Sequence, residues 1–236
     1  MSTTPPLNIV IVDLGAGNLG AIPNMLQRLG ATTTITQNPE TITAASHIIL
    51  PGVGAFDTVA RQVDALQLRD VLTTAAQKRY VPFLGICVGM QLLYAGSSEG
   101  QLPGLGWFPE TLTAFNPTLT NERGQPLRIP HMGWNTIADT AEIDVLQGFG
   151  ATPPRFYFVH SYHAPVVSNP LDNRKQAIAH YGQPFVAAVQ KNNIFGVQFH
   201  PEKSHRFGLH LFKHFIGLPS PYTAAPLLAD MEPTPC

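Results

Sequence analysis

Tyr80-Val-Pro-Phe-Leu-Gly-Ile-Cys87-Val-Gly-Met-Gln-Leu-Leu-Tyr-Ala95 is the stretch of the sequence that decides the fold. The apolar run of residues 81–86 predicts a buried strand, and residues 88–95 predict a helix that begins directly after the cysteine. The turn between them has the pattern Gly-x-Cys-x-Gly, and its glycines, Gly85 and Gly89, leave room for a sharp, strained backbone. This pattern is the thiol counterpart of the nucleophile elbow Gly-x-Ser-x-Gly.

Cys87 in this turn has two interpretations. A cysteine at the positive end of a helix is favoured as a thiolate, which is the nucleophilic form. Free cysteine is also among the most buried residue types, so a structural thiol in the core is the alternative. The elbow alone does not separate the two.

Strands and helices alternate through the first half of the chain. This alternation predicts right-handed crossovers and a parallel sheet. Pro82 fits such a sheet only at the first residues of its strand, because proline cannot donate to a ladder. The predicted strands are residues 8–13, 32–36, 47–50 and 81–86, and the predicted helices are residues 19–29, 56–78 (with a possible break) and 88–95.

The second half is mainly β in character. A hairpin turn is predicted at Asn192-Asn193, and an amphipathic helix at residues 205–216. We expect one domain over residues 1–217, followed by a Pro- and Ala-rich tail at residues 218–236. The predicted strands are residues 107–115, 127–129, 155–160, 177–181, 185–190 and 194–199.

Length and composition narrow the class of protein. With 236 residues, of which 44% are hydrophobic, the chain suits one α/β domain of ordinary size. The net charge of −1 gives no electrostatic reason to expect nucleic acid or an anionic membrane as a partner.

The cysteine count and the N-terminus predict the compartment. Cys87 and Cys236 make no disulfide framework, which favours a reducing compartment. Residues 1–6 lack the charged start and apolar core of a signal peptide. No apolar run approaches the roughly 20 residues of a membrane helix. We therefore expect a soluble, cytoplasmic protein.

A catalytic cysteine needs a base, and His200 is the candidate. It stands at the end of a predicted strand, in Gly196-Val-Gln-Phe-His200-Pro-Glu202. Because residues i and i+2 of an extended segment project to the same side, Glu202 can hold the second ring nitrogen of His200. The set has the same division of roles as the serine triad. Cys87 and His200 would both follow the carboxyl ends of strands, where open α/β sheets place their sites.

An acyl-transfer site also needs hydrogen-bond donors for an oxyanion. The backbone N–H of Val88, directly after the nucleophile, is one natural donor. Gly52, Val53 and Gly54 follow a predicted strand and can present further backbone N–H groups. An ordinary βα turn is the alternative interpretation of this glycine-rich segment. A phosphate cradle is disfavoured, because no Gly-Lys-Ser/Thr follows it.

A metal site is the competing use of cysteine and histidine. His160 and His163 lie three residues apart, and His210 and His214 lie four apart. No Cys-x-x-Cys accompanies them, so we expect neither a metal nor another cofactor. His210 and His214 are predicted to be exposed beside the apolar face of the last helix.

Together, Gly-Ile-Cys87-Val-Gly-Met-Gln, His200-Pro-Glu202 and Pro51-Gly-Val-Gly54 resemble the motifs of class I (triad) glutamine amidotransferases. Within that class, the chain is similar to the glutaminase subunits of imidazole glycerol phosphate synthase over about residues 8–217. The segments that carry this similarity are Asp13-Leu-Gly-Ala-Gly-Asn18, Pro51-Gly-Val-Gly-Ala-Phe56, Pro130-His-Met-Gly-Trp-Asn135, Tyr157-Phe-Val-His-Ser-Tyr162 and Phe199-His-Pro-Glu-Lys-Ser204.

The resemblance implies a fold and a reaction. The fold would be a flavodoxin-like three-layer sandwich, with a mostly parallel central sheet and additional antiparallel strands in the second half. Cys87, His200 and Glu202 would hydrolyse glutamine to glutamate and ammonia. Gln91, one helical turn after Cys87, would hold the substrate together with the backbone around Ser161 and Tyr162.

The resemblance also implies a separate partner, a (β/α)8-barrel cyclase subunit that receives the ammonia for histidine biosynthesis. The segment from Pro130 to Asn135 and Lys203 would face this partner. A structural role for both is the alternative, with Trp134 as a core residue.

Some residues depart from the family pattern. Leu14 stands where the family usually has Tyr, Val88 where it has Leu, and His163 where it often has Tyr. None of these departures touches the triad. The tail after Gly217 has no counterpart.

Two other functions remain open at the level of sequence. A paralogous glutaminase would carry nearly identical motifs but feed another acceptor, such as a sugar amidation system. A partner-binding module with a decayed site is the non-enzymatic alternative. The intact Cys87, His200 and Glu202 argue against decay.

Overall fold

The computed structural model of the protein describes residues 7–15, 17, 19–121, 123–138, 140–150, 153–168 and 170–221. Its main sheet has seven strands, of which the five from β12 to β2 run parallel. The strand β11 pairs antiparallel with both β12 and β10, so β11 alone runs in the opposite direction to the other strands of this sheet. The predicted sheet is confirmed. Its order is β10 (Lys175–His180), β11 (Pro184–Lys191), β12 (Ile194–Val197), β4 (Phe83–Cys87), β3 (His47–Gly52), β1 (Ile9–Val12) and β2 (Thr33–Thr36).

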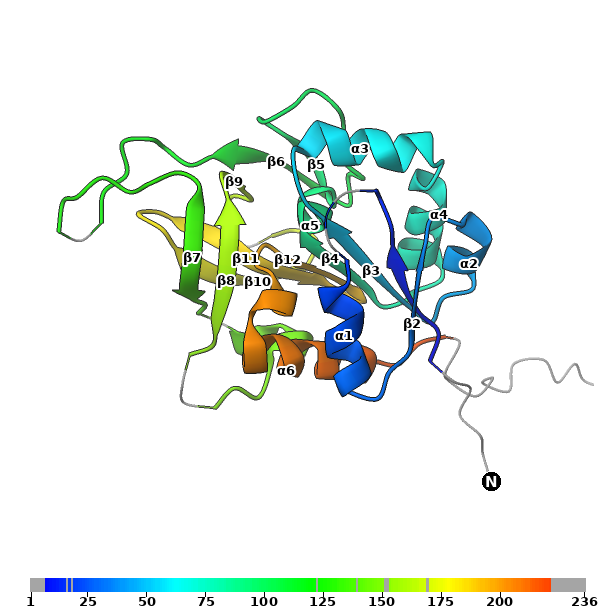
Figure 1. Cartoon of the computed structure of the whole chain (residues 1–236). Coiled ribbons are helices and arrows are strands. Elements are labelled where there is room, and N and C mark those ends of the chain that lie inside the picture. Colours follow the sequence, from blue (N-terminus) through cyan, green and yellow to red (C-terminus); the bar gives the residue numbers. More distant parts are fainter. Residues whose placement is uncertain are drawn as a thin grey trace, which may run out of the picture.

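Helices cover both faces of this sheet. In Figure 1, α1 and α6 lie on one face and α2, α3 and α4 on the other, which gives three layers. Central strands are therefore buried on both faces and carry nearly continuous apolar runs, such as β1 and β4. The helices are α1 (Ala21–Arg28), α2 (Pro39–Thr43), α3 (Phe56–Ala65), α4 (Arg69–Thr73), α5 (Val88–Gln91) and α6 (His205–Ile216), with a π-helical turn at Thr74–Lys78 and 3-10 turns at Thr140–Glu142, Asp144–Leu146 and Pro201–Lys203.

Two smaller sheets stand beside the main one. The first joins β5 (Tyr94–Ser97), β6 (Phe108–Ala114) and β9 (Tyr162–His163). The second is an antiparallel ribbon of β7 (His131–Thr136) and β8 (Arg155–His160). Figure 1 shows this ribbon at the side of the molecule that carries β10 and β11.

The predicted helix at residues 88–95 is wrong in length. The helix α5 has four residues, and β5 begins at Tyr94. Tyr94 pairs with Phe108 of β6, and Gly104 packs so closely that a Cβ there would lie 2.0 Å from the Tyr94 carbonyl oxygen. This tertiary pairing overrides the helical pattern of the apolar residues after Gln91.

The predicted helix at residues 56–78 is broken into three pieces. Gln67 has φ +54°, a left-handed conformation that ends α3 before α4 begins. The helix α2 is absent from the sequence-based prediction, although its start is readable. The side chain of Asn38 accepts hydrogen bonds from the backbone N–H groups of Glu40 and Thr41, and Pro39 occupies the first helical position.

Residues 127–129 do not form the predicted strand. Leu127 makes one backbone hydrogen bond to Leu119, next to an isolated bridge at Pro126. The strand of this region is β7 instead, at residues that the sequence predicts as a partner-facing loop. Burial along β7 alternates, as expected for a strand with one covered face.

The end of the domain packs onto the sheet. The Nε2 atom of His47 in β3 lies 3.2 Å from the carbonyl oxygen of Leu218, and Ser220 is buried. The rest of the predicted tail, residues 222–236 with Cys236, lies outside the described residues, as does Asn18. No helix in the described part of the chain is long and apolar enough to span a membrane.

Candidate active site

Cys87 ends β4 in a strained turn. Its φ of +55° and ψ of −114° are values that non-glycine residues rarely adopt. A Cβ on Gly89 would lie 1.8 Å from the carbonyl oxygen of Leu50, and one on Gly85 would lie 2.7 Å from that of Gly89. Both glycines are needed because backbone passes directly against them. The predicted elbow is confirmed.

The short helix α5 changes the electrostatic argument for Cys87. A helix of four residues aligns few peptide dipoles, so the dipole supports a thiolate less than the predicted eight-residue helix would. A charged neighbour is the stronger source of support. His200 is that neighbour.

Three adjacent strands bring the predicted site residues together. Gly52 at the end of β3 pairs with Cys87, and Val197 at the end of β12 pairs with Ile86 of β4. The carboxyl ends of β3, β4 and β12 therefore meet at one sheet edge, where ligands bind in open α/β sheets. His200 follows β12 at this edge.

Hydrogen bonds fix His200 on both sides. Its Nδ1 lies 2.7 Å from Oε1 of Glu202, as the sequence predicted. Its backbone N–H donates to the carbonyl of Tyr157, and its own carbonyl accepts from the hydroxyl of the buried Ser204. Its Nε2 has no hydrogen-bond partner among the described residues and is free to exchange a proton.

The surroundings of His200 favour its protonated form. Burial by itself lowers the pKa of His200, but the Cys87 thiolate and the Glu202 carboxylate outweigh burial and raise this pKa to about 10. At neutral pH His200 is therefore an imidazolium, and its positive charge favours the thiolate, the form in which cysteine is nucleophilic.

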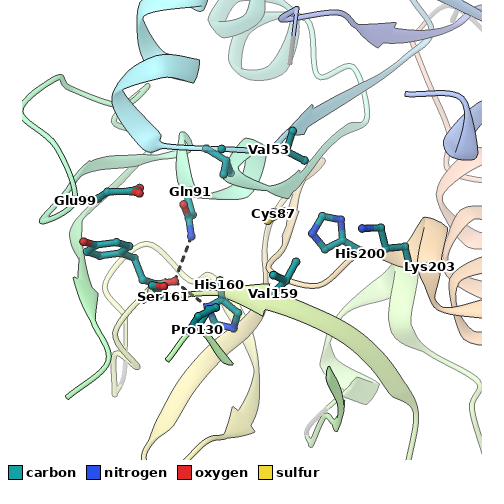
Figure 2. Close-up of a pocket in the computed structure, with 13 residues that line it drawn as sticks. Val53, Cys87, Gln91, Glu99, Pro130, Val159, His160, Ser161, His200 and Lys203 are labelled. Carbon is teal, nitrogen blue, oxygen red and sulfur yellow. Dashed lines mark hydrogen bonds between the residues drawn. The ribbon is translucent and has the colours of Figure 1, made fainter. Parts of the chain in front are cut away.

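Cys87 opens into a cavity of about 430 Å³. Figure 2 shows Glu99 and Gln91 toward one end, Cys87 between, and His200 with Lys203 toward the other. The cavity is large enough for an amino acid. It is lined by Val53, Gly54, Cys87, Val88, Gln91, Glu99, Pro130, Val159, His160, Ser161, Tyr162, His200 and Lys203.

The predicted oxyanion residues do not all reach this cavity. Val53, Gly54 and Val88 line it. Gly52 instead lies in β3 with its backbone against α5, where a Cβ would come within 2.7 Å of the Gly89 nitrogen. Gly54 has φ +93°, which a residue with a side chain would adopt only under strain.

The predicted substrate residues lie together. The Nε2 of Gln91 donates to the carbonyl oxygen of Tyr162 at 3.2 Å and to Oε1 of Gln198 at 3.0 Å. Gln198 in turn donates to Sγ of Cys87 at 3.8 Å. Ser161 and Tyr162 both line the cavity.

Two residues of this site are absent from the sequence-based prediction. Glu99 is the one acidic side chain among the described residues that line the cavity. It follows β5, a strand in a segment predicted as helix, so its position could not be read. Gln198 could have been found, because it stands two residues before His200 and an extended segment turns both to the same side.

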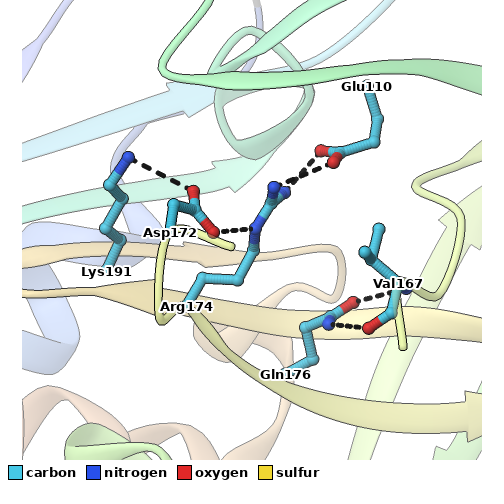
Figure 3. Close-up of polar contacts among 6 residues, drawn as sticks. All are labelled: Glu110, Val167, Asp172, Arg174, Gln176 and Lys191. Atoms are coloured by element: carbon cyan, nitrogen blue, oxygen red, sulfur yellow. Dashed lines mark hydrogen bonds and ion pairs between the residues drawn. The ribbon is translucent and has the colours of Figure 1, made fainter. Parts of the chain in front are cut away.

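The small sheet that carries Tyr162 is fastened by a buried ion-pair cluster, shown in Figure 3. Arg174, almost fully buried, binds both carboxylate oxygens of Glu110 in β6, and its Nε lies 2.7 Å from Asp172. Lys191 at the end of β11 lies 3.2 Å from the second oxygen of Asp172. The cluster thereby links β6 to the edge of the main sheet.

The histidine pairs do not gather metal ligands. Among the described residues, no group of three or more His, Cys, Asp or Glu side chains could hold a metal ion. His210 and His214 stack with ring centroids 4.4 Å apart. Both are half-buried rather than exposed, and His210 donates a hydrogen bond to the carbonyl oxygen of Gln147 at 2.6 Å.

The fold and the sequence are those of the glutamine amidotransferase class. The family model for glutamine amidotransferase class-I matches residues 10–217. Two solved structures show the same fold, each with a TM-score of 0.65. They are a putative GMP synthase protein from Thermoplasma acidophilum (20% identity, 90% of this chain and 93% of that one) and a glutamine amidotransferase (18% identity, 89% and 99%).

Nearer relatives narrow the class. The imidazole glycerol phosphate synthase subunit HisH 2 of Pseudomonas aeruginosa is 43% identical over 210 residues, which cover 89% of this chain and 99% of the relative. The corresponding HisH of Bdellovibrio bacteriovorus is 43% identical over 209 residues (88% and 98%). The chain belongs to the class-I glutamine amidotransferase family and, within it, to the HisH subunits of imidazole glycerol phosphate synthase.

Proposed function

We propose that this protein is the glutaminase subunit of an imidazole glycerol phosphate synthase and that it hydrolyses glutamine at Cys87. The observation that carries the proposal is the strained cysteine beside a buried His200–Glu202 pair, in a cavity that fits an amino acid. The membership in the HisH family supports the same activity.

The first half of the reaction forms a thioester. The Cys87 thiolate attacks the side-chain carboxamide carbon of glutamine, and the C=O π electrons move to the oxygen. The N–H of Val88 and backbone N–H groups of the segment at Val53 and Gly54 would hold this oxyanion. When the C–N bond breaks, His200 gives its proton to the leaving nitrogen, which departs as ammonia.

The second half releases glutamate. Neutral His200 takes a proton from water as the water oxygen attacks the thioester carbon, and the C–S bond breaks to return the Cys87 thiolate. Glu202 keeps Nδ1 of His200 protonated, so Nε2 is the atom that moves the proton. Atoms balance as glutamine plus water gives glutamate plus ammonia.

The far end of the cavity suits the rest of the substrate. Free glutamine carries an α-ammonium group, and Glu99 supplies a carboxylate at the end of the cavity away from His200 (Figure 2). Glu99 is held in place, since its Oε2 accepts from the backbone N–H of Phe56 at 2.9 Å. We assign it to the α-ammonium, and Gln91 with the backbone at Ser161 and Tyr162 to the remaining polar groups.

The partner in our proposal is a barrel-shaped cyclase subunit, in a heterodimer. An exposed apolar group on β7 and two residues before it supports a docking face: Ile129 is 38% exposed, Met132 60% and Trp134 41%. Trp134 is therefore not a core residue. It stacks on His205, and the neighbouring Lys203 lies over the ring of Tyr157.

The cytoplasm is the compartment that we propose. A catalytic thiol must stay reduced between turnovers, and a reducing compartment keeps it so. Cell fractionation with an antibody against the chain would check this assignment.

The deciding experiment is Cys87→Ala in the complex with the cyclase subunit. Glutamine-dependent synthesis should be lost, while synthesis from added ammonia should remain, because the cyclase chemistry does not use the thiol. Hydrolysis of glutamine by the variant would show that Cys87 is not the nucleophile. Growth without histidine after deletion of the chain would instead favour a glutaminase for another acceptor.

A further inference from the structure

We propose that His131 and His160 are positioning residues, which hold the Tyr162 carbonyl and thereby orient Gln91 toward bound glutamine. The inference rests on the proposed function, because it concerns the substrate end of the same cavity. It starts from a line of three hydrogen bonds that joins Asn135 in β7 to Tyr162 in β9.

The direction of this line follows from its last acceptor. Nδ1 of His160 lies 2.8 Å from the Tyr162 carbonyl oxygen, which can only accept, so Nδ1 carries the hydrogen. Nε2 of neutral His160 is then an acceptor, and it receives the Nδ1–H of His131 at 3.0 Å. Nε2 of His131 accepts in turn from the amide of Asn135 at 3.4 Å. One tautomer of each ring satisfies every contact.

The rings of His131 and His160 are both neutral. The line of hydrogen bonds requires this, because Nε2 of each ring must accept. Burial lowers the pKa of His160 to about 3 and that of His131 to about 4. Aromatic rings surround them, with Phe115, Phe158 and Phe185 against His160. The other titratable groups that face His160 are His163, which is bonded separately to Ala164 and Gln183, and His200.

The Tyr162 carbonyl is the point where this line meets the substrate residues. Its oxygen has two lone pairs, of which one takes His160 and the other takes Nε2 of Gln91 (Figure 2). Gln91 gives its second N–H to Gln198. Both hydrogens of the Gln91 amide are thus engaged, and Oε1 remains as the atom that it can offer to a substrate donor.

Loss of the His160 bond would release this arrangement. The Tyr162 peptide could rotate, and the Gln91 amide would no longer be held with Oε1 available. This change should affect the binding of glutamine rather than the chemical step. In the described part of the chain, no hydrogen bond joins His160 to Cys87, His200 or Glu202. KM for glutamine should change, and kcat should not.

Two variants of His160 separate this role from simple packing. Asn carries its amide nitrogen near the position of Nδ1 and can still donate to Tyr162, whereas Gln carries its amide near the position of Nε2 and cannot. In the complex with the cyclase, His160→Gln should raise KM for glutamine about tenfold, with kcat within about threefold of the wild type. His160→Asn should restore KM to within about threefold.

The matched control is His47→Gln, because His47 is an equally buried histidine that is hydrogen-bonded to Ser46 and Leu218 away from the cavity. It should lower thermal stability and leave KM unchanged. Equal KM values for His160→Gln and the wild type, or an equal rise in both His160 variants, would overturn the proposal. Wild-type glutaminase activity in the same assay tests the proposed function independently.

A measurement on the unsubstituted protein guards against variants that do not fold. Nitrogen-15 NMR distinguishes the two neutral tautomers of histidine. The Nδ1–H tautomer is expected for both His131 and His160 from pH 6 to 8. An Nε2–H tautomer at His160 would overturn the proposal without any variant.

Discussion

The backbone conformation at Cys87 depends on two neighbours, Gly85 and Gly89, that have no side chain. The left-handed φ of the cysteine turns the thiol into the cavity, and two glycines let the strand ends and α5 approach closely enough to keep it there. Strain of this kind costs of order 1–3 kcal/mol and persists where the surroundings impose it. The elbow is therefore a property of β3, β4 and α5 together.

Glu202→Gln tests the electrostatic role of the triad carboxylate. Gln can still accept from Nδ1 of His200 but carries no charge, so the pKa of His200 should fall from its raised value. We expect kcat for glutamine hydrolysis to fall by about 10²–10⁴, as replacement of a triad carboxylate does elsewhere. Histidine NMR titration checks the pKa of His200, and an unchanged titration would contradict the assigned role of Glu202.

The residues that we propose for the chemistry were readable from the sequence, whereas much of the substrate end of the cavity was not. Local sequence patterns predicted Cys87, His200 and Glu202, and the structure places these residues at one edge of the main sheet. Glu99 and His160 line the same cavity because β5, which precedes Glu99, and β9, which follows His160, both pair with β6. Sequence spacing carries no information about such contacts.

At the scale of elements, the turn that holds His200 depends on α6. Ser204 bonds to His200 and Tyr157 on its two sides, and Gly208 lies against the same turn. A Cβ at Gly208 would lie 1.8 Å from the carbonyl oxygen of Pro201, which is backbone and cannot move alone. Helix packing thus sets the position of His200, the proposed catalytic base.

A change from Gly to Ala inside a helix usually raises stability, but Gly208→Ala should lower it. In a helix, Ala is favoured over Gly by about 1 kcal/mol, yet here the clash should push α6 away from Pro201. We expect a lower melting temperature and a fall in kcat of at least tenfold. Gly96→Ala in β5 is the control, because a Cβ there has open space. A more stable, fully active Gly208→Ala would contradict this account.

The errors at this scale share one cause. The helical pattern of apolar residues continues through Leu92, Leu93 and Tyr94, but Tyr94 pairs with β6. The hydrogen-bonded pairing of the strands outweighs the helix propensity of this segment. The strand β7 was not predicted because Gly133 and the polar Asn135 interrupt its apolar pattern. Its partner β8 is also distant in sequence, since Arg155 at the start of β8 comes 19 residues after Thr136 at the end of β7. Long-range pairing decides both segments.

At the scale of the whole molecule, buried histidines should make stability depend on pH. The pKa of His47 and that of His131 are lowered by burial to about 4, and that of His160 to about 3. Between about pH 6.5 and 4, the unfolded chain binds protons that the folded chain does not. The free energy of unfolding should therefore fall as pH falls, by up to about 1.4 kcal/mol per pH unit for each histidine.

Urea unfolding at a series of pH values measures this dependence. His47→Gln removes one of the three groups and should reduce the slope. The contribution of His200 has the opposite sign, because its raised pKa gives stability that is lost as pH rises from 6.5 toward 10. Stability that is constant between pH 6.5 and 4 would contradict the burial of the three neutral rings.

Truncation tests the boundary that we propose for the domain. A chain that ends at residue 221 should keep its stability and its glutaminase activity with the cyclase, if residues 222–236 are a tail. A chain that ends at residue 217 should melt at a lower temperature, because it removes the carbonyl of Leu218 that His47 contacts. Loss of activity in the longer chain would place residues 222–236 within the functional domain.

The line from Asn135 to Tyr162 also limits where protons can travel. It ends on a peptide carbonyl, which is far too weak a base to be protonated, and each ring in it is neutral. Such a line holds atoms in place but conducts no proton. The line therefore gives protons no route along this wall of the cavity. In the proposed reaction, the substrate end can be held rigidly without removing from His200 the proton that leaves with ammonia.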